Sequence, residues 1–447
     1  MPSPLRAQWT TLGENPWTSL GENGWTSLGE NCWPSLGENV WTSIARKMTL
    51  AAAMTPLDPP VNGGTAPLDL PSNRGRTPLD PPVDKGAVGG LPPVDGGTVG
   101  GPTLRASEGL LENECLRLEL DAAGEITSLF DKEAGRELAA GVCNNFRLYK
   151  DVPGWFDAWD IDSQYALTPV DLPEPASVEV IASGPLFAAL RVTRRLHHST
   201  LTQEVRLRRH SRRVDFVTTI DWQESHKLLK VCFPVNIHAQ EAVHEIQFGH
   251  IRRPNHASRP FDADRFEVCN HKWSALMEED RGVAVLNDCK YGLNVLGNSI
   301  NLTLLKSALA PDMTADKGTQ TFTYSFYAWN GPFAQSDVVR EAYELNVPVL
   351  TAAGTAGECS LLCPDAANVI IEAVKAADDG SGDVIVRLYE AKRTATRCTL
   401  TTALPVQRAA ETDMLEGNPR ALACSGGSMA LDFRPFEIKT LRLALKP

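Results

Sequence analysis

The stretch Asn113–Leu138 reads NECLRLELDAAGEITSLFDKEAGREL, and its pattern decides the fold class. Apolar and polar residues alternate on both sides of Asp121-Ala122-Ala123-Gly124. Successive side chains of a strand point to opposite faces, so alternation favours strands with one buried and one exposed face. Asp and Gly between the two halves are typical of a tight turn. The stretch therefore predicts an antiparallel hairpin.

Similar β-like runs follow along the chain. They occupy 176–196, 201–210, 213–222, 228–237, 244–254, 281–288, 301–309 and 319–329. Their spacing and the turn residues between them predict a large antiparallel sandwich over 104–350. One helix is predicted over Ser336–Asn346, with Ser336 as N-cap. Runs at 367–377, 382–391, 397–404, 427–434 and 436–445 predict a smaller β-sandwich within 351–447, so the fold class is mainly β.

Residues 1–103 differ from the rest of the chain. Five tryptophans recur every eight residues, at positions 9, 17, 25, 33 and 41, and Pro56, Pro67 and Pro78 open units of eleven residues. Such short Gly- and Pro-rich units bury too little surface to offset chain entropy, so we expect a disordered segment. It could present Trp anchors to a partner, but its near-perfect repetition favours a translated tandem DNA repeat.

Composition limits the class of protein and its partners. The net charge of −12 over 447 residues argues against a nucleic-acid partner, because phosphate binding needs a surplus of Lys and Arg. No apolar stretch is long enough to cross a membrane, so no membrane partner is expected. The ten cysteines are scattered, and Cys232 and Cys269 lie in β-like runs. We interpret them as buried free thiols, which favours a cytoplasmic protein.

The stretch DVPGWFDAWDID (151–162) alternates Trp and Asp. If it were an extended strand, Trp155, Asp157 and Trp159 would share a face, and a carboxylate in a dry core costs several kcal/mol. A loop over a polar cleft is the better interpretation. Indole faces and carboxylates together are suited to a sugar, which offers both C–H faces and hydroxyls.

Eight motifs, in this order, resemble the C-terminal half of the α-mannosidases of glycoside hydrolase family 38. They are DVPGWFDAWDID (151–162), VCFPVNI (231–237), EIQFGHIRRPNH (245–256), FEVCNHKW (266–273), VAVLNDCKYG (283–292), LTLLKSALAPDMTADKGTQTFTY (302–324), VIVRLYEA (384–391) and FEIKTLRL (436–443). The likeness covers about 110–445 and is greatest to the cytosolic and vacuolar branch, so a vacuolar location is the alternative to the cytoplasm.

The resemblance implies a galactose-mutarotase-like sandwich followed by a small terminal β domain. It also implies retaining hydrolysis of α-mannosidic bonds, with a mannose-containing oligosaccharide as the ligand. In the family, zinc, the nucleophilic aspartate and the catalytic acid belong to an N-terminal α/β barrel.

This chain does not show the motifs of that barrel. None of the nine histidines lies in an HxHxD or HDxxTGT context, and the region before Leu104 is repeat sequence. His250 and His256 have metal-compatible spacing, but nothing nearby completes a site, so we interpret both as loop or surface residues. We therefore predict no catalytic residue and no metal ligand, and we expect the barrel to be missing or separately encoded.

What remains is the wall of the active site that the β region contributes. By its match to the family loop, 151–162 implies Trp155, Asp157, Trp159 and Asp160 as substrate-binding residues, with Tyr165 a weaker candidate. Arg252 and Arg253 of GHIRRP are the next candidates, since guanidinium groups can bind sugar oxygens or orient a carboxylate. The alternative for this Arg pair is a salt bridge to Asp262 or Asp264.

Three hypotheses follow for the whole chain. It is a truncated α-mannosidase, a carbohydrate-binding β module or subunit without catalysis, or an interaction protein that works through its Trp repeats. The first is favoured. If a barrel normally covers the Trp/Asp loop, the face that bears this loop should show an exposed apolar patch.

Overall fold

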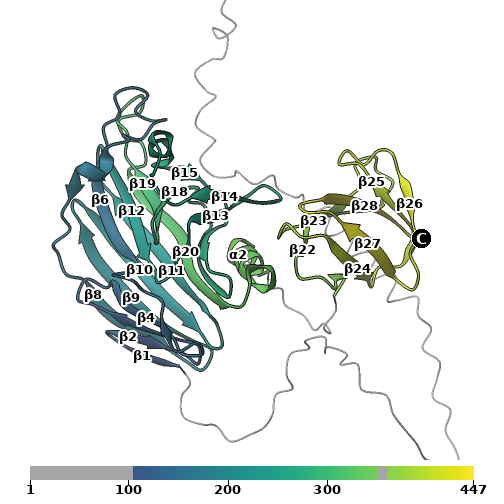
Figure 1. Cartoon of the computed structure of the whole chain (residues 1–447), viewed down its shortest axis with the longest axis horizontal. Helices are drawn as coiled ribbons and strands as arrows, with labels where there is room; N and C mark the ends of the chain where they lie inside the picture. Colours follow the sequence, from purple (N-terminus) through teal and green to yellow (C-terminus); the bar gives the residue numbers. More distant parts are fainter. Residues whose placement is uncertain (1–103, 348, 351–359, 447) are drawn as a thin grey trace, which may run out of the picture. The chain divides into compact units, whose positions relative to one another are not determined.

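The predicted hairpin is the centre of a five-stranded meander in the computed structural model, which describes residues 104–347, 349–350 and 360–446 (Figure 1). The expectations for the repeats fall on 1–103, outside the described residues. The meander consists of β1 (Arg105–Ser107), β2 (Leu110–Glu112), β3 (Leu116–Leu120), β4 (Ile126–Asp131) and β5 (Arg136–Glu137).

The turn between β3 and β4 confirms the predicted hairpin. The Asp121 carboxylate accepts the N–H groups of Ala123 and Glu125, and Gly124 adopts a left-handed backbone conformation with φ +74°. Glycine is needed there for a second reason. A Cβ atom at Gly124 would lie 2.3 Å from Cγ1 of Val192, a buried residue of another sheet.

Two antiparallel sheets form the large sandwich (Figure 1). The nine-stranded sheet has the order β14 (Gly249–Pro254), β13 (Glu241–Ile246), β16 (Trp273–Met277), β17 (Arg281–Asn287), β20 (Gly318–Asn330), β11 (Arg213–Trp222), β10 (Ser199–Arg208), β9 (Phe187–Leu196) and β8 (Ser177–Ser183). The six-stranded sheet has the order β15 (Val268–Cys269), β18 (Gly292–Leu296), β19 (Ser299–Lys306), β12 (Lys227–Pro234), β6 (Asn145–Lys150) and β7 (Pro169–Val170).

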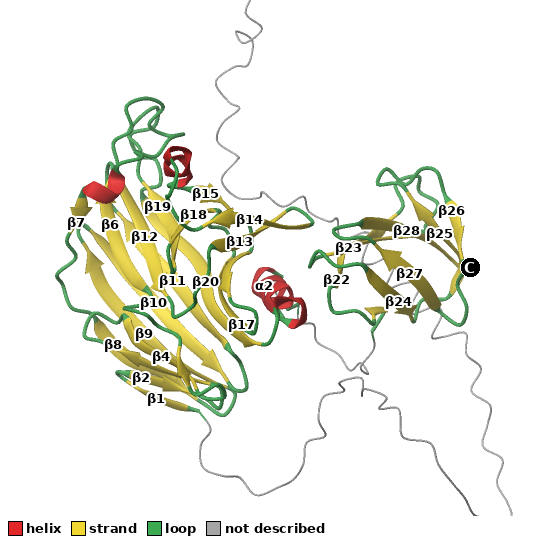
Figure 2. Cartoon of the chain, viewed as in Figure 1, coloured by secondary structure: helices red, strands yellow, loops and turns green. Residues whose placement is uncertain are grey.

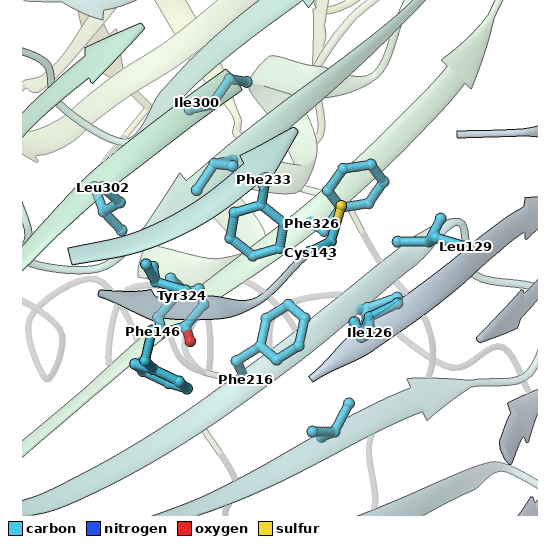
Figure 3. Packing of buried hydrophobic residues seen from close by; sticks show 14 of the residues in the cluster. Ile126, Leu129, Cys143, Phe146, Phe216, Phe233, Ile300, Leu302, Tyr324 and Phe326 are labelled. Atoms are coloured by element: carbon cyan, nitrogen blue, oxygen red, sulfur yellow. The ribbon is translucent and has the colours of Figure 1, made fainter. Parts of the chain in front are cut away.

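The core of this sandwich lies between the two sheets (Figure 3). Phe216 and Tyr324 from the nine-stranded sheet meet Phe233 from the six-stranded sheet, and the rings of Phe216 and Phe233 are 5.8 Å apart. These three side chains are fully buried. Alternate residues of each strand supply the core, as expected for two sheets that pack face to face.

Helix α2 (Val338–Asn346) packs on the outer face of the nine-stranded sheet, beside β16 and β17 (Figure 2). The predicted N-cap was wrong, because Asp337 and not Ser336 precedes the first helical residue. The Ser336 hydroxyl instead donates to the carbonyl of Phe333, in the short helix η3 (Phe333–Gln335).

The terminal domain is a second, smaller sandwich, as predicted. One sheet has the order β21 (Leu362–Pro364), β24 (Thr396–Thr402) and β27 (Ser428–Phe433). The other has the order β22 (Val369–Ala376), β23 (Val384–Glu390), β28 (Ile438–Leu445), β25 (Val406–Thr412) and β26 (Arg420–Leu422). Leu388, Leu400, Met429 and Leu441 are fully buried between them. The fold is therefore mainly β, with a large and a small sandwich.

Two predictions about burial, one for Cys269 and one for His250, were wrong. Cys232 is a buried free thiol, as expected, but Cys269 is exposed because it ends the two-residue edge strand β15. His250 is buried against Trp273 and Phe333 and is not a surface residue. Burial lowers the pKa of His250 to about 4. Within the part of the chain that the structure describes, no helix is long and apolar enough to cross a membrane.

Candidate functional site

The Trp/Asp stretch forms a loop at one end of the large sandwich (Figure 2). It begins after β6 ends at Lys150 and leads to the short helix η1 (Tyr165–Leu167). The expectation of a loop is thus confirmed over that of a strand. Hydrogen bonds from the N–H groups of Trp159 and Asp160 to the carbonyl of Phe156 turn the chain back on itself.

Three aromatic side chains of this loop point into solvent. Trp155 is 81% exposed, Phe156 74% and Trp159 75%. Such large side chains are normally buried, so three of them exposed in one loop are unusual; the expected contiguous patch stays a prediction. Phe156 was not among the predicted residues. It has φ +58°, in the left-handed region that bulky residues rarely adopt.

Asp157 lies on the opposite side of the loop from the indoles. Its Oδ2 accepts hydrogen bonds from the backbone N–H of Leu309 (2.7 Å) and of Ala310 (3.2 Å), and it lies 3.0 Å from Nε2 of His226. The shared face inferred for an extended chain therefore does not exist, because the turn at Phe156 rotates Asp157 inward. Asp160, by contrast, is exposed, and among the described residues its Oδ1 accepts a single hydrogen bond, from the N–H of Ile161.

The contacts of Asp157 change its acidity. Partial burial acts to raise the pKa of the carboxyl group, but the hydrogen bonds from Leu309, His226 and Ala310 favour the ionised form. The net result is a pKa below the ordinary value of 3.8. Asp157 is therefore a carboxylate at neutral pH.

Lys306 connects the loop to the end of β19. Its Nζ donates to the carbonyl oxygen of Asp157 (2.7 Å) and forms an ion pair with Oδ2 of Asp151 (2.9 Å). Oδ1 of Asp151 accepts the N–H of Asp162. Both ends of the loop are thus fastened. Sequence reasoning missed His226 and Lys306, although a charged residue at the end of the apolar run LTLLK was a signal.

The weaker candidate Tyr165 is buried and does not face solvent. Its hydroxyl accepts a hydrogen bond from Nδ2 of Asn294, and its ring stacks edge-on against Tyr149. Burial is the main reason that the pKa of this phenol is raised.

Arg252 and Arg253 lie on β14, at the edge of the nine-stranded sheet. Arg252 forms an ion pair with Glu241, and Arg253 donates to the carbonyl of Cys269. In the described residues, no hydrogen bond or ion pair joins either arginine to the 151–162 loop.

The predicted alternative, a salt bridge from Arg252 or Arg253 to Asp262 or Asp264, was wrong. The Asp262 carboxylate pairs with Arg259 and Arg265, which lie on its own 3-10 helix, η2 (Pro260–Arg265), or next to it.

Zinc does not fit the residues that the structure describes. Across 104–347, 349–350 and 360–446, no three His, Cys, Asp or Glu side chains come together in a way that could hold a metal ion. His256 lies beside Asp262, whose carboxylate is already paired with two arginines.

The fold resembles that of solved α-mannosidases. It matches an alpha-mannosidase from Enterococcus faecalis V583 with a TM-score of 0.61, over 76% of this chain and 43% of that one, at 18% identity. A family 38 protein from Enterococcus faecalis matches with a TM-score of 0.63. Residues 111–314 match the glycosyl hydrolases family 38 C-terminal domain, and 368–441 match the family's C-terminal beta sandwich domain. These domains define the β-rich part of a glycoside hydrolase.

Curated relatives give the same family. Alpha-mannosidase 2C1 from Homo sapiens is 38% identical over 350 residues, which is 75% of this chain and 34% of that protein. Alpha-mannosidase G from Dictyostelium discoideum is 35% identical over 355 residues, 74% of this chain and 32% of that protein. The chain belongs to glycoside hydrolase family 38 and matches the C-terminal half of α-mannosidases of that family. It spans about a third of the length of these relatives.

Proposed function

We propose that the β region forms the carbohydrate-binding wall of an α-mannosidase active site. In this proposal the tip of the 151–162 loop binds a mannose-containing oligosaccharide. The nucleophile, the acid and the zinc belong to a barrel outside this sequence, and the protein works in the cytoplasm. The relatives named above support the class of substrate.

The observation that carries this proposal is the exposure of two indoles next to an exposed carboxylate. Trp155 and Trp159 are 81% and 75% exposed, and Asp160 follows immediately. An indole face can stack on the C–H face of a pyranose, while a carboxylate accepts hydrogen bonds from its hydroxyls. Two stacking faces and one carboxylate on an open surface favour weak binding, with a Kd of about 1 mM or above.

Arg252 and Arg253 stay predictions as substrate-binding residues. Each would have to leave a present partner, Glu241 or the carbonyl of Cys269, before it could bind a sugar. Asp157 would have to give up three hydrogen bonds. The proposal therefore rests on Trp155, Trp159 and Asp160.

Binding can be tested with the full chain labelled with 5-fluorotryptophan. Methyl α-mannoside should shift the ¹⁹F resonances of Trp155 and Trp159, assigned through Trp155→Phe and Trp159→Phe, and leave the buried Trp222 unchanged. Asp160→Asn should weaken the response. Tyr291→Ala removes a half-exposed aromatic residue elsewhere and should not affect it. Unchanged Trp155 and Trp159 resonances at saturating sugar would refute the proposal.

The same protein tests whether catalysis needs the barrel. We expect no release of nitrophenol from nitrophenyl α-mannoside, with or without added zinc. Turnover that a chelator abolishes would show that this chain holds the catalytic groups itself. If sugar binding persists and no barrel is encoded in frame upstream, the second function, a carbohydrate-binding module or subunit, is favoured.

A further inference from the structure

Three neighbouring strands end together beneath the Trp/Asp loop. In the six-stranded sheet, β6 ends at Lys150, β12 begins at Lys227 and β19 ends at Lys306, and the order of these strands is β19-β12-β6. The register pairs Lys227 with Lys150, and Leu228 with Lys306. Antiparallel pairing therefore sets the residues at these three strand ends next to one another.

The backbone continues this alignment past the strands. The N–H of Asp151 donates to the carbonyl of His226 (3.0 Å), and the N–H of His226 donates to the carbonyl of Ser307 (2.7 Å). Of the side chains at these ends, His226 and Lys306 contact Asp157 of the loop, and Asp151 is joined to it through its ion pair with Lys306. We call these four residues the strand-end clamp.

We infer that Asp157 is a positioning residue and not a sugar ligand, and that the strand-end clamp holds Trp155 and Trp159 in the conformation that binds sugar. The inference rests on the proposed function. Oδ2 of Asp157 receives its hydrogen bonds from His226, Leu309 and Ala310, so this oxygen faces the protein and not a ligand. The other oxygen, Oδ1, is buried and lies 3.7 Å from Nζ of Lys306.

Lys306 is the central residue of the strand-end clamp because its positive charge compensates two negative charges. Its ammonium group faces two carboxylates, those of Asp151 and Asp157, and Asp151 is almost fully buried. Removal of this one positive charge leaves two neighbouring carboxylates that repel each other in a partly buried site. We expect this repulsion to displace the loop.

The backbone conformation at the tip of the loop also needs support from the residues that anchor Asp157. Phe156 sits in the left-handed region (φ +58°), which is unfavourable for an aromatic residue, and it directly precedes Asp157. Its side chain contributes little to holding this geometry, because it is 74% exposed, and the turn is closed by the backbone hydrogen bonds to its carbonyl. The hydrogen bonds of Asp157 add a second attachment for the loop that bears the two indoles, and an ordered loop loses less entropy when a ligand binds.

Two variants break the clamp, and each has a matched control. Lys306→Met removes the charge and keeps most of the apolar stem, and Lys317→Met makes the same change at an exposed position before β20. Asp157→Asn removes the carboxylate charge, with Asp171→Asn at an exposed position as its control. Lys306→Arg restores the positive charge.

The readouts are hydrogen exchange of 152–162 in the full chain and the binding curve of methyl α-mannoside from ¹⁹F resonances. If the competent loop falls to a tenth of the population, the apparent Kd rises about tenfold. We expect this rise, together with faster exchange of 152–162, for Lys306→Met and Asp157→Asn. Both controls should match the parent protein, and Lys306→Arg should recover part of the affinity.

The outcomes separate the two proposals. Unchanged exchange and affinity in Asp157→Asn and in a folded Lys306→Met would overturn the clamp, even if the parent protein binds mannoside. Asp157→Asn alone decides the matter if Lys306→Met fails to fold. Faster loop exchange in a protein that binds no mannoside upholds the clamp as the anchor of the loop and overturns the proposed function.

Discussion

Gly124 is the position where one added methyl group should reveal the contact between the hairpin and the sandwich. Alanine in the left-handed region costs about 1–2 kcal/mol. Its Cβ would also lie 2.3 Å from Cγ1 and 3.3 Å from Cβ of Val192. Val192 is buried and β-branched, so it cannot easily rotate away, and overpacking of this kind costs about 1–3 kcal/mol. The two effects together predict a loss of about 2–5 kcal/mol in the free energy of unfolding.

Gly135 provides the control within the same stretch of sequence. It also has a positive φ, +62°, but a Cβ atom there would meet nothing within 4 Å. Gly135→Ala should therefore lose only the backbone part, about 1–2 kcal/mol. The difference between the two alanine variants isolates the contact with Val192.

A double-mutant cycle completes the test. Val192→Ala alone removes two buried methyl groups and should cost about 1.6 kcal/mol. Combined with Gly124→Ala, it opens space for the new methyl group, so the double variant should be more stable than the sum of the single effects predicts, by about 1–3 kcal/mol.

The assay is urea unfolding of the 5-fluorotryptophan-labelled protein, followed by the ¹⁹F resonance of the buried Trp222 on β11 of the large sandwich. The reasoning fails if Gly124→Ala and Gly135→Ala lose equal stability, or if the effects of Gly124→Ala and Val192→Ala are additive. Equal losses in the free energy of unfolding would mean that a Cβ atom at Gly124 makes no unfavourable contact with Val192 on β9.

Two further predictions concern the core and pH. Tyr324→Phe removes the buried hydroxyl that donates to Oδ1 of Asn144 and accepts from Nε2 of Gln203. The free energy of unfolding should fall by about 1–3 kcal/mol in the same urea assay. A change near zero would show that these amides find other partners. For pH, the folded-state pKa of Asp157 lies below 3.8, so its contribution to stability is fully present above that value and is lost as pH falls through the folded-state pKa. The ¹⁹F resonances of Trp155 and Trp159 should therefore change below about pH 3.8, at a site that Lys306, His226 and Asp151 also face. Asp157→Asn should abolish the change, and a persistent transition would assign it to another group.

Local patterns were sufficient for the β architecture and for the position of the loop. Alternation with a period of two identified most strands, and Asp121 with Gly124 identified the hairpin, because both signals depend on neighbouring residues only. The N-cap of α2 was displaced by one residue because the hydroxyl of Ser336 bonds to Phe333 and not to the helix. The burial of His250 was missed because its ring neighbours, Trp273 and Phe333, lie far away in the sequence.

For the candidate site, sequence identified the residue types but not their directions. Trp155, Trp159 and Asp160 are exposed as a ligand-binding loop requires, whereas Asp157 faces the protein. The inward direction of the Asp157 side chain depends on the left-handed turn at Phe156, which the alternating pattern does not indicate.

By itself, the sequence determined the fold class, the family and the concentration of indoles and carboxylates in one short segment. Only the tertiary structure decided which groups support that segment. Asp157 meets His226 across 69 positions of sequence and Lys306 across 149. Such contacts follow from the order and register of β19, β12 and β6, which bring distant strand ends together. Strand order is a property of the folded sheet, and no local pattern of side chains specifies it.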